Sequence, residues 1–288
     1  MKVKEMTLLE KDHYVFHSCQ RGDASKPPIV VIGSALYYPR LFQDECFAGF
    51  NLIFIDHRGF VQPKSDAASY SLADVVDDIE AFRLQLGLEK MVLLGHSGHG
   101  FMAMAYAQAY GEHVAGLILS NLAPTNSPER QAGSLAYFDQ TASATRKALF
   151  AAEISHLAAD IEADPDHRFS HINRRMRTHA FYAEDYAGPD DWAGVVNHMP
   201  ALDYLWGVAF AEFDTAGFLR QWSGPLLLLL CDHDYLVGPP SLWDALIQEQ
   251  EIDWLKFHQS GHNPMLEEPQ AYAAALTGFM STIYLTTR

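Results

Sequence analysis

A serine in the stretch Met91–Gly100 has neighbours that suit a nucleophile. The residues that open the stretch are apolar and uncharged, and the following Phe101–Ala107 favours a helix, so Ser97 lies at a predicted strand–turn–helix junction. Gly95 and Gly98 are small enough for the strand and the helix to approach closely. The start of the helix directs free N–H groups and a positive dipole end toward the serine. The pattern predicts that Ser97 attacks a substrate and forms a covalent intermediate.

The glycine spacing after this serine departs from the usual Gly-x-Ser-x-Gly pattern. His99 stands two residues after Ser97, and a glycine follows only at Gly100. Two interpretations stay open: the turn is repacked around the imidazole, or His99 lines the site.

Two loops that follow predicted strands offer the base and the acid that a serine nucleophile needs. The later loop, Ser260–Pro264, carries His262, which would take the proton of the serine hydroxyl. The earlier loop carries Asp232 and Asp234, of which one would fix the tautomer of the imidazole and stabilise the imidazolium. We prefer Asp234, because the acid usually lies a few residues into the loop. The alternative for either aspartate is a loop carboxylate that accepts backbone N–H groups.

An oxyanion needs two preorganised donors. The Gly98 N–H is one candidate because it follows the nucleophile directly. The second is the Ser34 N–H, which lies just after the apolar run Ile29–Ile32. The alternative is that Gly33 and Ser34 form only a turn.

Short apolar runs along the chain would position these residues. Predicted strands cover residues 29–32, 50–55, 91–94, 114–119, 226–231 and 254–257, and Tyr14–His17 is a predicted edge strand. Helices are predicted over 72–86, from about 241 and from about 269. This alternation predicts an α/β fold: a mostly parallel sheet, flanked by helices, with functional residues at the carboxyl ends of the strands.

The alternation of strands and helices stops after Pro124. Residues 125–221 are rich in Ala, His, Arg and aromatic residues and contain no apolar strand pattern. We expect an inserted helical cap at 125–221 and a discontinuous core domain formed by 1–124 and 222–288.

The composition restricts the class of partner. The chain has 288 residues, with 20 basic against 36 acidic residues and a net charge of −16, which argues against nucleic-acid and anionic-membrane partners. The longest apolar run, Leu226–Cys231, is far shorter than the ~20 residues of a membrane helix. The N-terminal residues contain no apolar signal core. We expect a cytoplasmic protein with a small-molecule substrate, whose oligomeric state the sequence does not determine.

No metal and no cofactor is expected. Three cysteines at positions 19, 46 and 231 have no metal-ligand or disulfide spacing. A metal cluster of His57, His96 and His99 is the alternative, but no Glu or Cys completes a ligand spacing. Arg58 is expected to hold loops together rather than to contact substrate.

These motifs together resemble the α/β-hydrolase superfamily, and within it the proline iminopeptidase-like serine hydrolases. The similarity covers residues 12–123 and 222–285 and rests on Gly95-His-Ser97, Asp56-His-Arg-Gly59, Asp234 and Gly261–Pro269. Ile32-Gly33 replaces the His-Gly that the family usually has before the second oxyanion donor.

The resemblance implies a serine hydrolase that cleaves an ester or amide of a small, partly apolar molecule through an acyl-enzyme. The first alternative is a proline iminopeptidase-like aminopeptidase, which would need a cap carboxylate to bind the substrate amine. The available carboxylates are Asp190, Asp191, Asp203, Glu212 and Asp214. The second alternative is a ligand-binding homologue that keeps the triad but turns over slowly.

Overall fold

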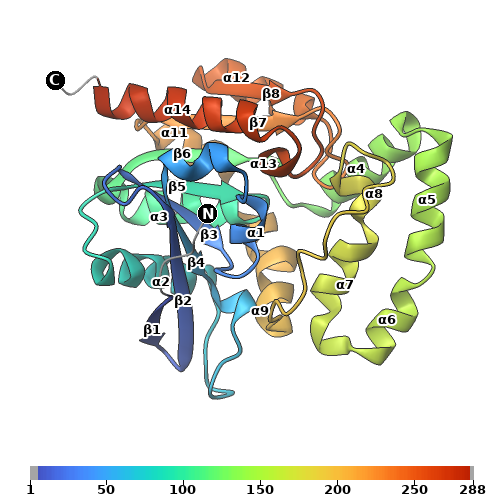
Figure 1. Cartoon of the computed structure of the whole chain (residues 1–288), viewed down its shortest axis with the longest axis horizontal. Helices are drawn as coiled ribbons and strands as arrows, with labels where there is room; N and C mark the ends of the chain where they lie inside the picture. The colour runs from blue at the N-terminus through green and yellow to red at the C-terminus, as the bar shows by residue number, and fades with distance from the viewer. Residues whose placement is uncertain (1–5, 286–288) are drawn as a thin grey trace.

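An eight-stranded sheet runs through the centre of the molecule (Figure 1). The computed structural model describes residues 6–285. The strand order is β1-β2-β4-β3-β5-β6-β7-β8. The strands are β1 (Thr7–Lys11), β2 (Tyr14–Gly22), β3 (Pro28–Gly33), β4 (Asn51–Asp56), β5 (Met91–His96), β6 (Val114–Ser120), β7 (Leu226–Cys231) and β8 (Asp253–Phe257).

Strands β3 to β8 pair in parallel, whereas β2 pairs antiparallel with both β1 and β4. The predicted edge strand at Tyr14–His17 was wrong in its position, because β1 lies outside β2 in the sheet. Residues Thr7–Lys11 are mostly exposed and lack an apolar run, so the pattern gave no strand signal there. The parallel strands end at one common edge of the sheet, which is where the predicted site residues lie.

Helices cover both faces of the sheet in two separate apolar layers. One layer contains α2, α3, α11, η6 and α12, and the other contains α1, η1, α13 and α14. The strands β3 to β7 are buried on both faces because each contributes alternate side chains to the two layers. The helical segments of this part are α1 (Tyr38–Leu41), η1 (Glu45–Gly49), η2 (Arg58–Phe60), α2 (Leu72–Gln85), α3 (His99–Ala109), η3 (Gly111–His113), η6 (Pro240–Trp243), α12 (Asp244–Gln250), α13 (Pro264–Glu267) and α14 (Pro269–Leu285).

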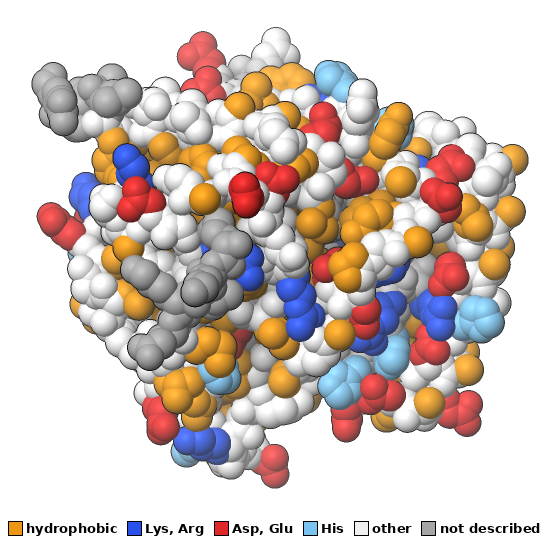
Figure 2. Space-filling view, in the orientation of Figure 1, with side chains coloured by type: hydrophobic (Ala, Val, Ile, Leu, Met, Phe, Trp, Pro, Cys, Tyr) orange, Lys and Arg blue, Asp and Glu red, His pale blue; other side chains and the backbone are white. Residues whose placement is uncertain are grey.

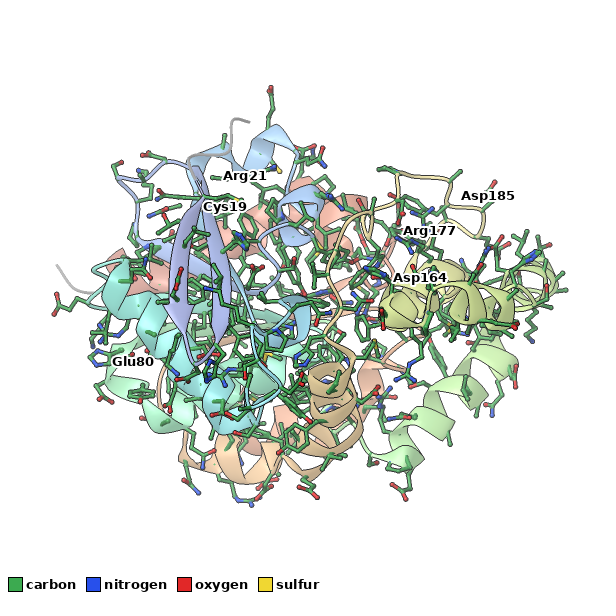
Figure 3. All side chains as sticks on the ribbon, turned by 90° about the horizontal axis from the view of Figure 1, so that it is seen from below. Cys19, Arg21, Glu80, Asp164, Arg177 and Asp185 are labelled. Atoms are coloured by element: carbon green, nitrogen blue, oxygen red, sulfur yellow. The ribbon has the colours of Figure 1, made fainter. Side chains whose placement is uncertain are left out.

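The segment between β6 and β7 is helical, and in the described chain it contains no strand. Its helices α5, α6 and α7 stand away from the sheet in Figure 1, and Figure 3 shows Asp164, Arg177 and Asp185 on the side of the molecule opposite Cys19 and Glu80. Its last helix, α11, packs instead against α3 and α12. The segment comprises α4 (Pro128–Thr141), α5 (Ala144–Ile154), α6 (Leu157–Ala163), η4 (Pro165–His167), α7 (Arg168–Arg175), α8 (Arg177–Ala180), α9 (Met199–Tyr204), the π-helical turn η5 (Leu205–Ala209), α10 (Phe210–Glu212) and α11 (Thr215–Gln221).

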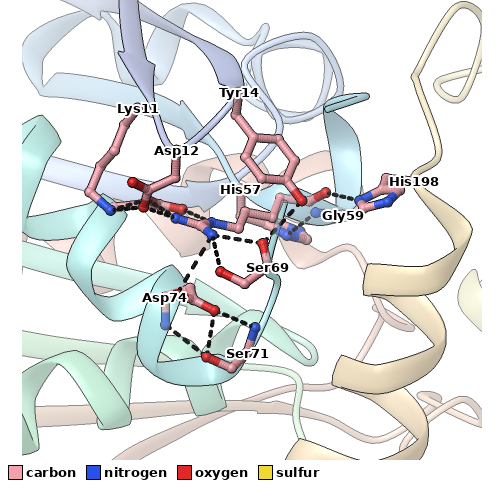
Figure 4. Close-up of polar contacts among 11 residues, drawn as sticks. Lys11, Asp12, Tyr14, His57, Gly59, Ser69, Ser71, Asp74 and His198 are labelled. Carbon is pink, nitrogen blue, oxygen red and sulfur yellow. Dashed lines mark hydrogen bonds and ion pairs between the residues drawn. The ribbon is translucent and has the colours of Figure 1, made fainter. Parts of the chain in front are cut away.

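Arg58 is completely buried and holds three segments together. Figure 4 shows Asp12, Tyr14 and Ser69, which come from these surroundings, close to one another. Its Nε lies 2.6 Å from Asp78 Oδ2, its Nη2 lies 2.8 Å from Asp12 Oδ2, and its Nη1 lies 2.7 Å from the Ser69 carbonyl oxygen. The guanidinium also lies 5.0 Å from the centroid of the Tyr14 ring. These contacts agree with the expected role of Arg58 in holding loops together.

Asp and Glu side chains are spread over the face shown in Figure 2, as the net charge of −16 implies. None of the helices within residues 6–285 combines the length and the apolar character needed to cross a membrane. The cytoplasmic location stays a prediction.

Candidate active site

Ser97 occupies the turn between β5 and α3 with a positive φ of 58°. Its N–H donates to the Ser120 carbonyl oxygen at 2.9 Å, which ties the turn to the end of β6. The strand and the helix meet so closely that a Cβ atom on Gly95 would lie 2.6 Å from Gly100 Cα. A left-handed serine is strained, and here the packing on both sides holds it in place.

A cavity of about 210 Å³ lies over this turn. Ser97 and His262 both line it, as do Gly98 and His99. Its wall contains aromatic side chains from both the sheet part and the inserted helices: Tyr37, Tyr38, Phe101, Phe169, Trp192 and Trp206. The predicted nucleophile and the predicted base therefore line one mainly apolar cavity.

His262 is held by a buried carboxylate. Its Nδ1 lies 2.7 Å from Asp234 Oδ2, and Asp234 is 1% exposed. The second carboxylate oxygen accepts the N–H groups of Leu236 at 3.1 Å and Val237 at 3.3 Å. Since Nδ1 is engaged by the carboxylate, Nε2 is the ring nitrogen available to exchange a proton with a hydroxyl group.

The carboxylate of Asp232 binds residues other than His262. Its carboxylate contacts His258 Nδ1 at 2.6 Å and Lys256 Nζ at 3.1 Å, at the end of β8. The loop turns at residues 232 and 233 instead of staying extended, so the two aspartates point to different partners. The structure therefore brings Asp234 to His262 and leaves Asp232 in a partly exposed ion pair.

Asn121 was not anticipated from the sequence. It follows β6 with a positive φ of 50°, and its Nδ2 donates to Asp234 Oδ2 at 3.0 Å and to the Gly261 carbonyl oxygen at 3.1 Å. The amide thus links the acid loop to the loop that carries His262. An Asn directly after a predicted strand could have indicated a left-handed position, but not these partners.

The two predicted oxyanion donors are placed differently. Gly98 is the N-cap of α3 and lines the cavity. Ser34 is buried and does not line it, and its Oγ accepts the N–H groups of Leu36 and Tyr37, each at 3.2 Å. No described residue accepts a hydrogen bond from the backbone N–H of either Gly98 or Ser34.

His99 packs into a buried cluster beside the nucleophile. Its Nδ1 lies 2.9 Å from both the Tyr38 hydroxyl and the His96 carbonyl oxygen, and its Nε2 lies 3.1 Å from His57 Nε2. Both ring nitrogens are therefore occupied by protein groups. Within residues 6–285, no group of three His, Cys, Asp or Glu side chains is arranged to hold a metal ion.

Comparison with known proteins places this architecture in a family. A family model described as the alpha/beta hydrolase fold matches residues 31–269. The AB hydrolase superfamily protein YclE of Bacillus subtilis is 44% identical over 260 residues, which cover 89% of this chain and 92% of that protein. The chain belongs to the α/β-hydrolase fold family. It is accordingly an enzyme of the α/β-hydrolase class, as the motifs predicted.

Other relatives of this α/β hydrolase agree with the predicted resemblance. A proline iminopeptidase, PfmaB, of Pestalotiopsis fici is 39% identical over 85 residues, which cover 29% of this chain and 30% of that protein. The solved structure of a proline iminopeptidase from Mycobacterium smegmatis superposes with a TM-score of 0.72 at 18% identity, covering 99% of this chain and all of that one. The structural likeness supports the fold alone.

Proposed function

We propose that this α/β hydrolase is a serine hydrolase that cleaves an ester or amide of a small, partly apolar molecule through an acyl-enzyme. Ser97 is the nucleophile, His262 is the general base and acid, and Asp234 orients the imidazole. The observation that carries the proposal is that Ser97 and His262 line one cavity while Asp234 engages the far ring nitrogen of His262 at 2.7 Å.

In this mechanism Ser97 Oγ attacks the substrate carbonyl as His262 Nε2 takes its proton. The N–H groups of Gly98 and Ser34 stabilise the oxyanion, and each lowers the barrier by about 3 kcal/mol. His262 then gives the proton to the leaving alcohol or amine, and the acyl group stays on Ser97. A water molecule, activated by His262 in the same way, releases the acid and restores the serine.

The lining of the cavity favours a substrate without a free amine. None of the described residues that line it is an Asp or a Glu, so an ammonium group would enter without a counter-charge. The aromatic wall suits an apolar acyl or alcohol group. We also propose that residues 125–221 form the cap domain over a core of 1–124 and 222–288, because Phe169, Trp192 and Trp206 close the cavity from that segment.

A second candidate is an aminopeptidase, and one observation favours it. Asp191 is 6% exposed and lines a small cavity of about 20 Å³ that shares Tyr37, Asn173 and His262 with the larger one. Burial raises the pKa of Asp191, although nearby Arg177 and Arg40 oppose that shift. Asp191 does not line the cavity that contains Ser97, so we rank this candidate second.

The test is covalent labelling of Ser97 combined with a substrate panel. A fluorophosphonate should label one peptide containing Gly95–Gly100, and Ser97→Ala should abolish labelling. Chromogenic esters of varied chain length should be hydrolysed with rapid turnover, and aminoacyl anilides poorly. Labelling that survives Ser97→Ala would remove the nucleophile, efficient anilide cleavage would favour the aminopeptidase, and labelling without turnover would favour a ligand-binding homologue.

A further inference from the structure

Arg130 brings a positive charge to the wall of the reaction cavity. It lies in α4, near the start of the inserted helices, and lines the cavity together with Ser97 and His262. Among the described residues that line this cavity, Arg130 is the only Arg, Lys, Asp or Glu. In a chain with a net charge of −16, a single cation facing an otherwise neutral wall requires an explanation.

The guanidinium of Arg130 contacts only neutral acceptors. Nη1 donates to Ser134 Oγ at 3.2 Å and to the Leu236 carbonyl oxygen at 3.0 Å, and Nη2 donates to Asn126 Oδ1. These three bonds use three of the five guanidinium N–H groups. The Nε atom is buried and has no partner in the described chain.

Three other arginines of the inserted helices have carboxylate partners, whereas Arg177 donates to the carbonyl oxygens of Gly188 and Pro189. Arg168 pairs with Asp203, Arg174 with Asp190, and Arg175 with Asp160. For Arg130 no ion pair with a carboxylate occurs within residues 6–285. Burial lowers the pKa of Arg130, and only the distant charge of Asp234 opposes that shift. A buried cation with unused donors is costly unless an anion joins it.

Arg130 also borders a second cavity, and an anion that binds Arg130 would lie between the two cavities. A neighbouring cavity of about 490 Å³ is also lined by Arg130 and shares with the first cavity Asn126, Phe169, Ile172, Trp206 and Leu236. Arg130 therefore stands at the common wall of the two cavities. A substrate whose scissile bond lies at Ser97 would reach this wall with its remote end.

We propose that Arg130 recognises a carboxylate on the substrate, so that the natural substrate is an anionic ester with an apolar middle and a carboxylate at its remote end. The planar guanidinium matches a carboxylate with two parallel hydrogen bonds. The inference rests on the proposed serine-hydrolase function and specifies its substrate class. Arg130 acts as a specificity-determining residue and takes no part in bond cleavage.

If Arg130 had a purely structural role, its substitution would affect charged and neutral esters differently from what carboxylate recognition predicts. Its bond to the Leu236 carbonyl oxygen fastens the loop that carries Asp234. If that were its whole role, substitution would lower turnover of charged and neutral esters by the same factor. Carboxylate recognition instead changes the ratio between them, chiefly through KM.

The first experiment uses the wild-type enzyme and two matched pairs of esters. One pair, 4-acetoxybenzoate and its methyl ester, places the carboxylate on the leaving group. The other pair, 4-nitrophenyl hydrogen adipate and 4-nitrophenyl methyl adipate, places it on the acyl group. In one pair we expect kcat/KM of the carboxylate ester to exceed that of its methyl ester at least tenfold, and we expect this ratio to fall with added salt. A ratio of one or less in both pairs overturns the proposal.

The second experiment uses Arg130→Gln, with Arg175→Gln as its matched control because Arg175 lines neither of the two cavities and is paired with Asp160. Arg130→Gln should lower the carboxylate preference at least tenfold through KM, and Arg175→Gln should keep the wild-type ratio. An unchanged ratio in Arg130→Gln, or an equal fall for both esters, contradicts carboxylate recognition.

A binding measurement separates this inference from the proposed function and does not need a folded Arg130 variant. Calorimetry with Ser97→Ala should show the carboxylate member of one pair binding at least tenfold more tightly than its methyl ester. Equal binding of both members overturns the inference even if esters are hydrolysed. Tight carboxylate binding without any ester turnover by the wild type would instead refute the hydrolase function alone.

Discussion

His57 Nε2 lies 3.1 Å from His99 Nε2, and the contacts on the far sides of the two rings decide which nitrogen carries the proton. The Gly59 N–H donates to His57 Nδ1 at 3.0 Å, so His57 carries its own proton on Nε2. The His96 carbonyl oxygen can only accept, so His99 carries its proton on Nδ1, 2.9 Å away. His57 therefore donates to His99, and both rings are neutral.

The same reasoning extends to His96. Its Nε2 lies 2.7 Å from the His262 carbonyl oxygen and must donate, which leaves Nδ1 to accept the Tyr38 hydroxyl at 3.1 Å. Burial lowers the pKa of His57 and of His96 well below the ordinary value, and lowers that of His99 to about 4. Three neutral imidazoles thus support the backbone at His262 without a free nitrogen for catalysis.

Replacing His99 should damage stability more than catalysis. Because both of its ring nitrogens bond to protein groups, we expect His99→Gly to keep ester turnover within about tenfold, equal to about 1.4 kcal/mol of barrier. The variant leaves the His57 N–H without an acceptor and opens a cavity, so the free energy of unfolding should fall by about 3 kcal/mol. Steady-state kinetics and denaturant unfolding measure the two effects. A thousandfold loss of turnover in a folded variant would show that the imidazole participates directly.

The depressed pKa of His99 predicts a pH-dependent stability difference. Between pH 6.5 and about 4 the unfolded chain binds a proton at this residue and the native protein does not, so the contribution of His99 to stability falls as the pH falls. The free energy of unfolding of the wild type minus that of His99→Gln should shrink by about 1.4 kcal/mol per pH unit across this window.

Glu267 changes the pH dependence of stability in the opposite direction to His99, because burial raises the pKa of Glu267 to about 7. Its contribution is present in both proteins and cancels in their difference. Urea unfolding of both proteins at pH 7, 6 and 5 provides the test. A difference that stays constant with pH would mean that His99 is protonated alike in the native and unfolded states.

The acid that serves His262 can be identified by two matched substitutions. Asp234→Asn removes the acceptor that fixes the His262 tautomer, and we expect a loss of about ten-thousandfold in ester turnover. Asp232→Asn breaks only a partly exposed ion pair with Lys256 and His258 and should change turnover little. Thermal melting controls for folding. If Asp232→Asn, and not Asp234→Asn, lost most of its ester turnover, the assignment of the acid would be wrong.

Chelation should leave ester hydrolysis unchanged. The proposed mechanism uses Ser97, His262 and Asp234 and requires no Lewis acid. Rates measured before and after treatment with a chelator, and again after addition of zinc, make the comparison. A large loss that zinc restores would instead support a metal site at the histidine cluster.

The sequence by itself determined the fold class and indicated the loops that carry the candidate site. Apolar runs alternating with helical patterns predict a parallel sheet, and such a sheet gathers its loops at one edge, so Ser97, Asp234 and His262 could be selected from local patterns. The strand β1 was missed because an exposed strand outside the core has little apolar pattern.

Only the tertiary structure decided the partners of these residues. Asp232 and Asp234 are two positions apart, yet a turn directs one toward β8 and the other toward His262. Asn121 meets Asp234 across 113 positions of the chain, and Arg130 reaches the reaction cavity from an inserted helix. Local patterns report periodicity and turn chemistry, whereas contacts between distant segments depend on how the packed layers are placed against one another.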